Sequence, residues 1–165
     1  MTEDRAQQWK PILVAALAAT AVAAIGALMT NLGSWYVSLH KPSWQPPGWM
    51  FGPAWTLIFA LCALSGYIAW RSAPNRGGRD GVLALFTLNG LLNVLWSALF
   101  FRLERPDWAL IEAVLLWLSI LLMISALARY SKIASALLVP YLAWVSFAIV
   151  LNWTVVRLNA PFIGT

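Results

Sequence analysis

The sequence predicts an all-α integral membrane protein: a bundle of five transmembrane helices with a long loop between the first and the second. Of its 165 residues, 61% are hydrophobic and only 10% are charged, whereas a soluble domain carries roughly 25% charged residues. The mean hydropathy of +0.74 points the same way. The charges also gather in short groups between apolar stretches, and a stretch of about 20 apolar residues is long enough to cross a bilayer.

Five such apolar stretches follow one another along the chain. Because backbone polar groups cannot stay unpaired in lipid, each stretch is predicted to be a helix. The expected helices cover residues 11–32, 48–71, 81–102, 107–129 and 133–157, all within a single domain of residues 1–165. Within the apolar stretch from Trp108 to Ala128, Glu112 is the only acid. We expect it near the membrane surface, because the start of a helix favours a negative charge.

The basic residues predict the orientation of the chain in the membrane. With five spans, seven of them fall on the side of the N-terminus and four on the other side. The seven are Arg5, Lys10, Arg71, Arg76, Arg79, Arg129 and Lys132, and the four are Lys41, Arg102, Arg105 and Arg157. Because Lys and Arg accumulate on the cytoplasmic side, the N-terminus is predicted inside. Topology thus accounts for the net charge of +5 without a nucleic-acid partner.

The segment from Trp35 to Trp55, WYVSLHKPSWQPPGWMFGPAW, is unusual for a connection between membrane helices. It contains four tryptophans, four prolines and two glycines. Prolines forbid a helix across it but suit the first turn of the helix that follows. Such a stiff aromatic segment is predicted to cover something beneath it. Its histidine, His40, has no Cys or carboxylate neighbour and is expected to be a solvated loop residue.

Tryptophans and amides also lie deep inside the predicted spans. An aromatic belt at the headgroups explains many of the 11 tryptophans. It does not explain the deep ones, which are Trp55, Trp96, Trp117 and Trp144. Indole N–H groups need partners when buried, so these residues are either packing bulk or the lining of a cavity for a flat aromatic ligand. Both interpretations stay open from composition alone.

Asn89 and Asn93 lie one turn apart on one face of the third predicted helix. They are either interhelical hydrogen-bonding groups or polar groups of a pocket. Pro140 is expected to kink the fifth helix. On the first helix, small residues recur every four positions, at Ala15, Ala19, Ala23 and Ala27. Such a face allows close helix packing, within the bundle or in a homodimer.

Catalytic groups are scarce in the predicted spans. They contain no carboxylate pair, no Ser–His–acid set, no metal cluster and no glycine-rich phosphate loop. The lack of buried charges also argues against an ion-coupled transporter. A binding protein is therefore favoured over an acid–base enzyme.

Three motifs carry a resemblance to a known family. They are WYVSLHKPSWQPPGWMFGPAWT (Trp35–Thr56), LNVLWSALFF (Leu92–Phe101) and PYLAWVSFAIVLNW (Pro140–Trp153). In sequence and order they resemble the TspO/MBR family of tryptophan-rich sensory and translocator proteins. The resemblance covers essentially the whole chain and implies a five-helix bundle with a pocket under the first loop.

The resemblance implies a binder of porphyrin, haem and similar flat hydrophobic molecules that acts as a sensor, regulator or carrier. It implies no obligatory cofactor and no metal site, and it makes a bacterial cell membrane the expected location. The ligand-binding residues that it implies are Tyr36, Pro46, Trp55, Phe59, Asn89, Asn93, Trp96, Trp144, Ala148 and Leu151.

Two alternatives follow from the same resemblance. One is light- and oxygen-dependent breakdown of porphyrin, for which Trp55 and Trp144 would be the catalytic candidates. The other is transport of a tetrapyrrole or a sterol. The sterol motif of the family needs a tyrosine where this chain has Trp153, so a tetrapyrrole is the better-matched ligand.

Overall fold

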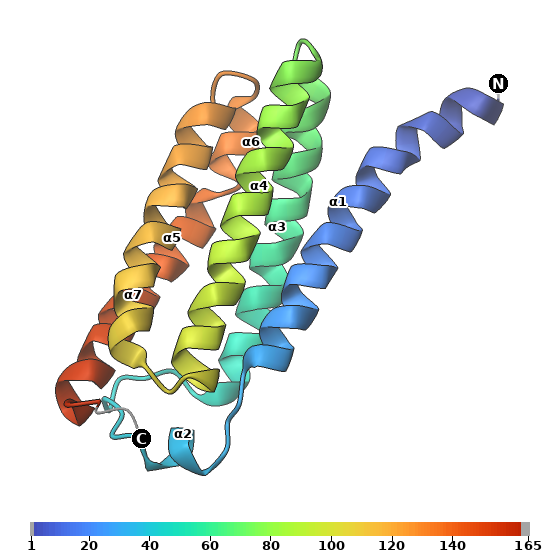
Figure 1. Cartoon of the computed structure of the whole chain (residues 1–165). Coiled ribbons are helices and arrows are strands. Elements are labelled where there is room, and N and C mark those ends of the chain that lie inside the picture. Colours follow the sequence, from blue (N-terminus) through green and yellow to red (C-terminus); the bar gives the residue numbers. More distant parts are fainter. Residues whose placement is uncertain (1, 163–165) are drawn as a thin grey trace.

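The computed structural model describes residues 2–162, with side chains described for residue 13 and residues 15–162. Within this part, all regular structure is helical (Figure 1). The elements are α1 (Thr2–Met29), α2 (Ser34–Ser38), η1 (Gly48–Met50), α3 (Phe51–Ser72), α4 (Arg76–Ser97), η2 (Ala98–Arg102), α5 (Pro106–Leu127), α6 (Lys132–Ala136) and α7 (Val139–Asn159). The helical segments long and apolar enough to cross a membrane are Gly48–Ser72, Arg76–Arg102, Pro106–Leu127 and Lys132–Asn159, and Ala15–Met29 is a shorter apolar one. The predicted all-α integral membrane protein is confirmed.

Among the helix ends that differ from the predicted boundaries, two lie beside asparagine side chains that bond to the backbone. α1 ends at Met29 rather than at residue 32, and Asn31 Oδ1 then accepts the N–H of Gly33 at 3.0 Å in a turn. α4 begins at Arg76 rather than at residue 81, because the Asn75 side chain accepts the N–H of Gly78 at 2.9 Å. An Asn at this position satisfies a free N–H of the first turn, so the helix begins within the segment that separates the second and third predicted helices.

The last apolar stretch is not one continuous helix. It is divided into α6 and α7, which meet at residues 137–138. Pro140 was predicted to kink this helix, and the structure interrupts the helix just before the proline. The proline itself lies in the first turn of α7, where its missing N–H costs nothing. Ser135, at the end of α6, donates its hydroxyl to the carbonyl of Ile124 at 2.7 Å. This bond ties the short helix back to α5.

The bundle is closed at one end by a packed core. α5 packs along α4 and α7, and α1 packs along α3 and α4 (Figure 1). Near α6, a cluster of buried residues fills the space between α3, α4 and α5; it consists of Ala69, Val82, Met123, Leu127, Ala134 and Leu138. α1 approaches α4 closely at Gly90, where an added Cβ would stand 2.9 Å from Val22 Cγ2.

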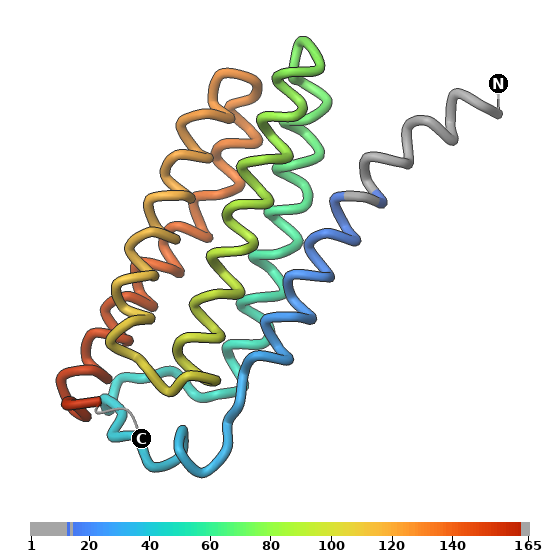
Figure 2. Tube along the Cα trace, in the orientation of Figure 1, coloured from blue at the N-terminus to red at the C-terminus, as the bar shows by residue number. Residues whose placement is uncertain are grey.

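At the other end, the connection of residues 30–47 crosses the bundle from α1 toward α7 and returns to α3 (Figure 2). Leu39 is buried there against Phe100, Ala109 and Val155. The His40 backbone is held at both its polar groups: its N–H donates to Asn159 Oδ1 at 2.8 Å, and its carbonyl accepts from Asn159 Nδ2 at 2.8 Å. The connection is therefore fixed to the end of α7.

Glu112 was expected near the membrane surface, where water is close, but its side chain is buried inside the bundle. Its side chain is only 4% exposed, and neither carboxyl oxygen has a hydrogen-bond partner among the described residues. The reason is its register on α5. Ala109, Ala113 and Leu116 are buried at the i−3, i+1 and i+4 positions, so Glu112 falls on the helix face that packs inside the bundle.

Candidate ligand-binding cavity

A cavity of about 930 Å³ lies between the helices at the end covered by residues 30–47. Its walls come from α1, α3, α4, η2, α5 and α7, and the covering connection contributes lining residues at one end. Sites for small organic ligands are concave, mostly apolar and about 300–1,000 Å³ in volume. The cavity is therefore large enough for a ligand of substantial size.

Most residues that the resemblance implied for binding lie around this one cavity. Those that line it are Tyr36, Trp55, Phe59, Asn93, Trp96, Trp144, Ala148 and Leu151. Pro46 and Asn89 do not line it. Pro46 is half-buried in the covering connection. Asn89 is buried between α4 and α5, where its amide donates to Ser119 Oγ at 2.8 Å.

One wall of the cavity is an aromatic cluster on α3 and α7. Trp55 stacks on Phe59 one turn along α3, with 5.4 Å between ring centroids. The indoles of Trp55 and Trp144 meet edge to face at 6.5 Å. Phe51 and Phe147 extend the cluster at 5.8 and 5.7 Å from Trp144. Offset and edge-to-face contacts of this kind hold the rings in defined orientations.

A second aromatic wall comes from the end of α4 and from η2. η2 is a π-helical turn, in which the N–H of Leu103 donates to the carbonyl of Ala98 at 2.9 Å. The widened turn brings Trp96, Phe100 and Phe101 to the cavity together. Trp96 stacks on Phe100 at 5.1 Å, and Tyr36 of the connection packs on Phe101 at 5.6 Å. π-helical turns often occur at functional sites.

The deep polar groups fall into two kinds. Asn93 lines the cavity and donates its amide to the buried Tyr141 hydroxyl at 3.2 Å, so it is both an interhelical bond and a cavity group. Asn89 makes only an interhelical hydrogen bond and does not line the cavity. The deep tryptophans divide in the same way: Trp117 does not line the cavity and donates its indole N–H to Ser146 Oγ at 2.8 Å.

α1 supplies the part of the wall that is made of small residues. Those lining the cavity are Ala16, Ala19, Ala23, Gly26 and Ala27. The predicted alanine stripe thus faces the interior of the bundle. Its small side chains leave space between α1 and the aromatic walls, so the stripe contributes to the cavity volume.

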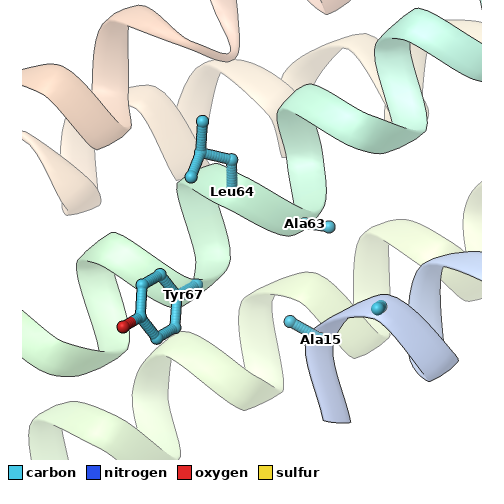
Figure 3. A pocket seen from close by; sticks show the side chains of 5 residues that line it. Ala15, Ala63, Leu64 and Tyr67 are labelled. Carbon is cyan, nitrogen blue, oxygen red and sulfur yellow. The ribbon is translucent and has the colours of Figure 1, made fainter. Parts of the chain in front are cut away.

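A smaller cavity of about 260 Å³ adjoins the large one at the α1–α3 contact (Figure 3). It is lined by Ala15, Ala16, Ala63, Leu64 and Tyr67. Ala16 and Ala63 line both cavities. The two spaces therefore meet at a seam of small side chains between these helices.

Polar side chains of the covering connection gather at one end of the large cavity. Tyr36, Lys41 and Gln45 line it from the connection. Gln45 Nε2 donates to the Tyr36 hydroxyl at 3.5 Å. Lys41 Nζ donates to the carbonyl of Tyr36 at 2.5 Å and lies 4.3 Å from the centroid of the same residue's ring.

Several lining residues were not predicted as binding residues. Lys41 and Gln45 lie next to predicted residues of the connection, and Lys41 was used only as a topology charge. Phe100 and Phe101 reach the cavity through the π-helical turn, for which the sequence carries no clear pattern. Trp153, at the position of the sterol motif, is 48% exposed and does not line the cavity.

The fold and the cavity together define a class: an all-helical integral membrane protein with an aromatic-walled internal cavity. A model of the TspO/MBR family matches residues 13–158. The chain is 46% identical over 132 residues to a tryptophan-rich protein TspO of Chlorobaculum tepidum, covering 76% of this chain and 80% of that protein. It is 39% identical over 151 residues to a tryptophan-rich protein TspO of Archaeoglobus fulgidus, covering 90% and 97%. It is 34% identical over 131 residues to the human translocator protein, covering 79% and 78%. The chain belongs to the TspO/MBR family.

Proposed function

We propose that this protein binds a tetrapyrrole, porphyrin or haem, or a similar flat hydrophobic molecule in the large cavity, as a sensor, regulator or carrier. The observation that carries the proposal is the pair of aromatic walls, one around Trp55 and Trp144 and the other around Trp96, on a single cavity of about 930 Å³. Aromatic rings present flat apolar faces that stack on a planar guest. The amide of Asn93 and the polar side chains of the covering connection are available to the polar edge of such a guest.

Tryptophan substitutions test this proposal with a matched control inside the same protein. Trp55→Phe and Trp144→Phe each shrink an aromatic wall of the cavity, whereas Trp117→Phe removes an equally deep indole outside it. Purified protein is titrated with porphyrin and followed by tryptophan fluorescence. We expect weaker binding and less quenching in the first two variants and wild-type affinity in the third. If all three variants had the same porphyrin affinity and the same quenching, the cavity would not be the binding site.

The proposed membrane arrangement has five spans, with α1 as the additional one. α1 comprises 28 residues, and at 1.5 Å per residue a helix of that length extends about 42 Å, more than the roughly 30 Å of a bilayer core. With five spans the termini lie on opposite sides, the N-terminus inside by the positive-inside rule. Cysteines placed near either end, labelled from one side of sealed vesicles, should react at only one end. Labelling of both ends from one side would contradict five spans.

Light-dependent oxidation of bound porphyrin by dioxygen is a second candidate activity. It needs an indole against the macrocycle, and Trp55 and Trp144 both line the cavity. Illumination of the complex in air should then give a defined open-chain product in the wild type. If the Trp55→Phe/Trp144→Phe variant gave the same product yield as the wild type, the product would come from photochemistry of the pigment that does not depend on these indoles.

A further inference from the structure

The smaller cavity is a groove that can be reached from the outside of the bundle. This α1–α3 groove is lined by Ala15, Ala16, Ala63, Leu64 and Tyr67. Figure 3 shows Ala63 and Tyr67 of α3 with Ala15 of α1 across the space. Leu64 does not line the large cavity and is 46% exposed, so the groove opens on the outer surface of the protein. Because α3 belongs to a segment apolar enough to cross a membrane, this surface faces lipid.

The side chains of the groove suit a hydrocarbon chain. Three of the five lining residues are alanines, which leave the space between α1 and α3 unfilled. An empty space loses the contacts of its lining atoms. Water gains little there, because a buried water needs several polar partners and the only polar side-chain atom of the lining, the Tyr67 hydroxyl, already accepts from Arg71. An acyl chain of the surrounding bilayer is the favoured occupant.

A positive charge lies at one end of the groove. Arg71 follows Tyr67 by one turn of α3; its Nη1 donates to the Tyr67 hydroxyl at 3.0 Å, and its guanidinium carbon lies 5.8 Å from the centroid of the Tyr67 ring. The helix rises about 12 Å from Ala63 to Arg71, which is less than half of the roughly 30 Å of a bilayer core. The groove and the guanidinium therefore fall within one leaflet, as the chain and the headgroup of one lipid do.

The Arg71 guanidinium keeps free donors for an anion. It is exposed, and among the described side chains the only ion pair joins Arg105 and Asp107. An arginine has five N–H donors in a planar fork that fits a phosphate. Two further exposed arginines, Arg76 and Arg79, follow at the start of α4. Basic residues gathered at a membrane surface attract anionic headgroups.

We propose that the α1–α3 groove binds an anionic glycerophospholipid, with one acyl chain in the groove and the phosphate on Arg71. This site and its ligand are distinct from those of the large cavity, and the proposal does not depend on what that cavity binds. Ala16 and Ala63 line both spaces, so the acyl chain lies along the small side chains at which the two spaces meet.

Native mass spectrometry of the protein in detergent tests the site with two lipids that have the same acyl chains, phosphatidylglycerol and phosphatidylcholine. The fraction of protein that carries one lipid, followed against lipid concentration, gives the two dissociation constants. The wild type should bind phosphatidylglycerol about fivefold or more tightly, the contribution expected of one arginine beside an anionic headgroup. Arg71→Gln should lose most of that preference. Ala15→Leu should weaken the binding of both lipids, because Ala15 lines only the groove.

Each variant has a matched control. Arg129→Gln removes an exposed arginine at the same end of the bundle but after α5, away from α1 (Figure 1). Ala18→Leu makes the same change as Ala15→Leu at an exposed position of α1 that lines neither cavity. Both controls should bind the two lipids as the wild type does.

Three results would overturn the proposal. Equal affinities of the wild type for the two lipids, or an unchanged preference in Arg71→Gln, would mean that Arg71 does not bind the phosphate. Wild-type lipid binding in Ala15→Leu would place the lipid outside the groove. A dimer that Ala15→Leu dissociates, and that phosphatidylglycerol does not, would mean that a second copy of the chain covers the groove.

Discussion

The two asparagines of α4 allow a sharp test of where the cavity ends. Asn89→Leu and Asn93→Leu are the same chemical change one helical turn apart. Each removes one interhelical hydrogen bond, to Ser119 Oγ at 2.8 Å and to Tyr141 Oη at 3.2 Å. Such bonds in membrane bundles contribute about 0.6 kcal/mol on average and up to about 1.7 kcal/mol.

The two variants should differ modestly in stability for a structural reason. Ser119 keeps a hydrogen bond from its hydroxyl to the carbonyl of Leu116 at 2.7 Å when Asn89 is lost. Tyr141 is 2% exposed, and loss of Asn93 removes the side-chain donor to its hydroxyl. An unsatisfied buried polar group costs about 1–3 kcal/mol. We therefore expect a loss near 1 kcal/mol for Asn89→Leu and somewhat more, about 1–2 kcal/mol, for Asn93→Leu.

Ligand affinity should separate the pair clearly, because only Asn93 lines the cavity. Loss of one neutral hydrogen bond to a ligand, about 0.5–1.5 kcal/mol, corresponds to roughly a two- to tenfold weaker complex. Unfolding in SDS titrations gives the stabilities, and porphyrin titration gives the dissociation constants. Asn93→Leu should weaken binding while Asn89→Leu leaves it unchanged. An equal loss of affinity in the two variants would refute the assignment of the cavity boundary.

Three further substitutions probe other features of the fold. Glu112→Met should raise the free energy of unfolding by about 1–3 kcal/mol, because it removes a buried carboxyl group without a described partner. SDS unfolding measures this change. A destabilised variant would mean that the carboxyl group has a structural role. Gly90→Val should destabilise the bundle by about 1–3 kcal/mol and weaken porphyrin binding. The new Cβ at residue 90 would stand 2.9 Å from Val22 Cγ2 and push α1 away from α4. An unchanged porphyrin affinity would contradict the close α1–α4 contact. Asn159→Leu should speed amide exchange at His40, whose N–H loses its acceptor; unchanged exchange there would mean that the clamp does not hold the connection.

Much of the fold follows from elementary properties of the sequence. Apolar stretches without charges predict the helices, since lipid leaves no other partner for the backbone. The aromatic, proline-rich connection was expected to cover something, and it crosses the end of the bundle at which the cavity lies. The helix boundaries were less predictable. The start of α4 depends on the cap at Asn75, a local hydrogen bond that hydropathy does not record. The division of the last stretch lies just before Pro140, where a disturbance was expected, but hydropathy does not show that it separates two helices.

Only part of the cavity lining could be predicted from the sequence, because neighbouring helices decide which residues reach the cavity. Deep tryptophans can pack or line a cavity, and only the arrangement of neighbouring helices separates Trp55 from Trp117. Asn89 and Asn93 share a face, yet the cavity reaches only as far as Asn93, and at Asn89 α5 provides a side-chain partner. Glu112 could have been predicted to be buried, because it lies in register with Ala109 and Leu116 on the buried face of α5.

A structure of the protein with a bound porphyrin tests the central claim most directly. We predict the macrocycle inside the bundle, between the indoles of Trp55 and Trp144 on one side and Trp96 on the other. A macrocycle bound on the outer, lipid-facing surface, with the cavity free of ligand, would contradict it.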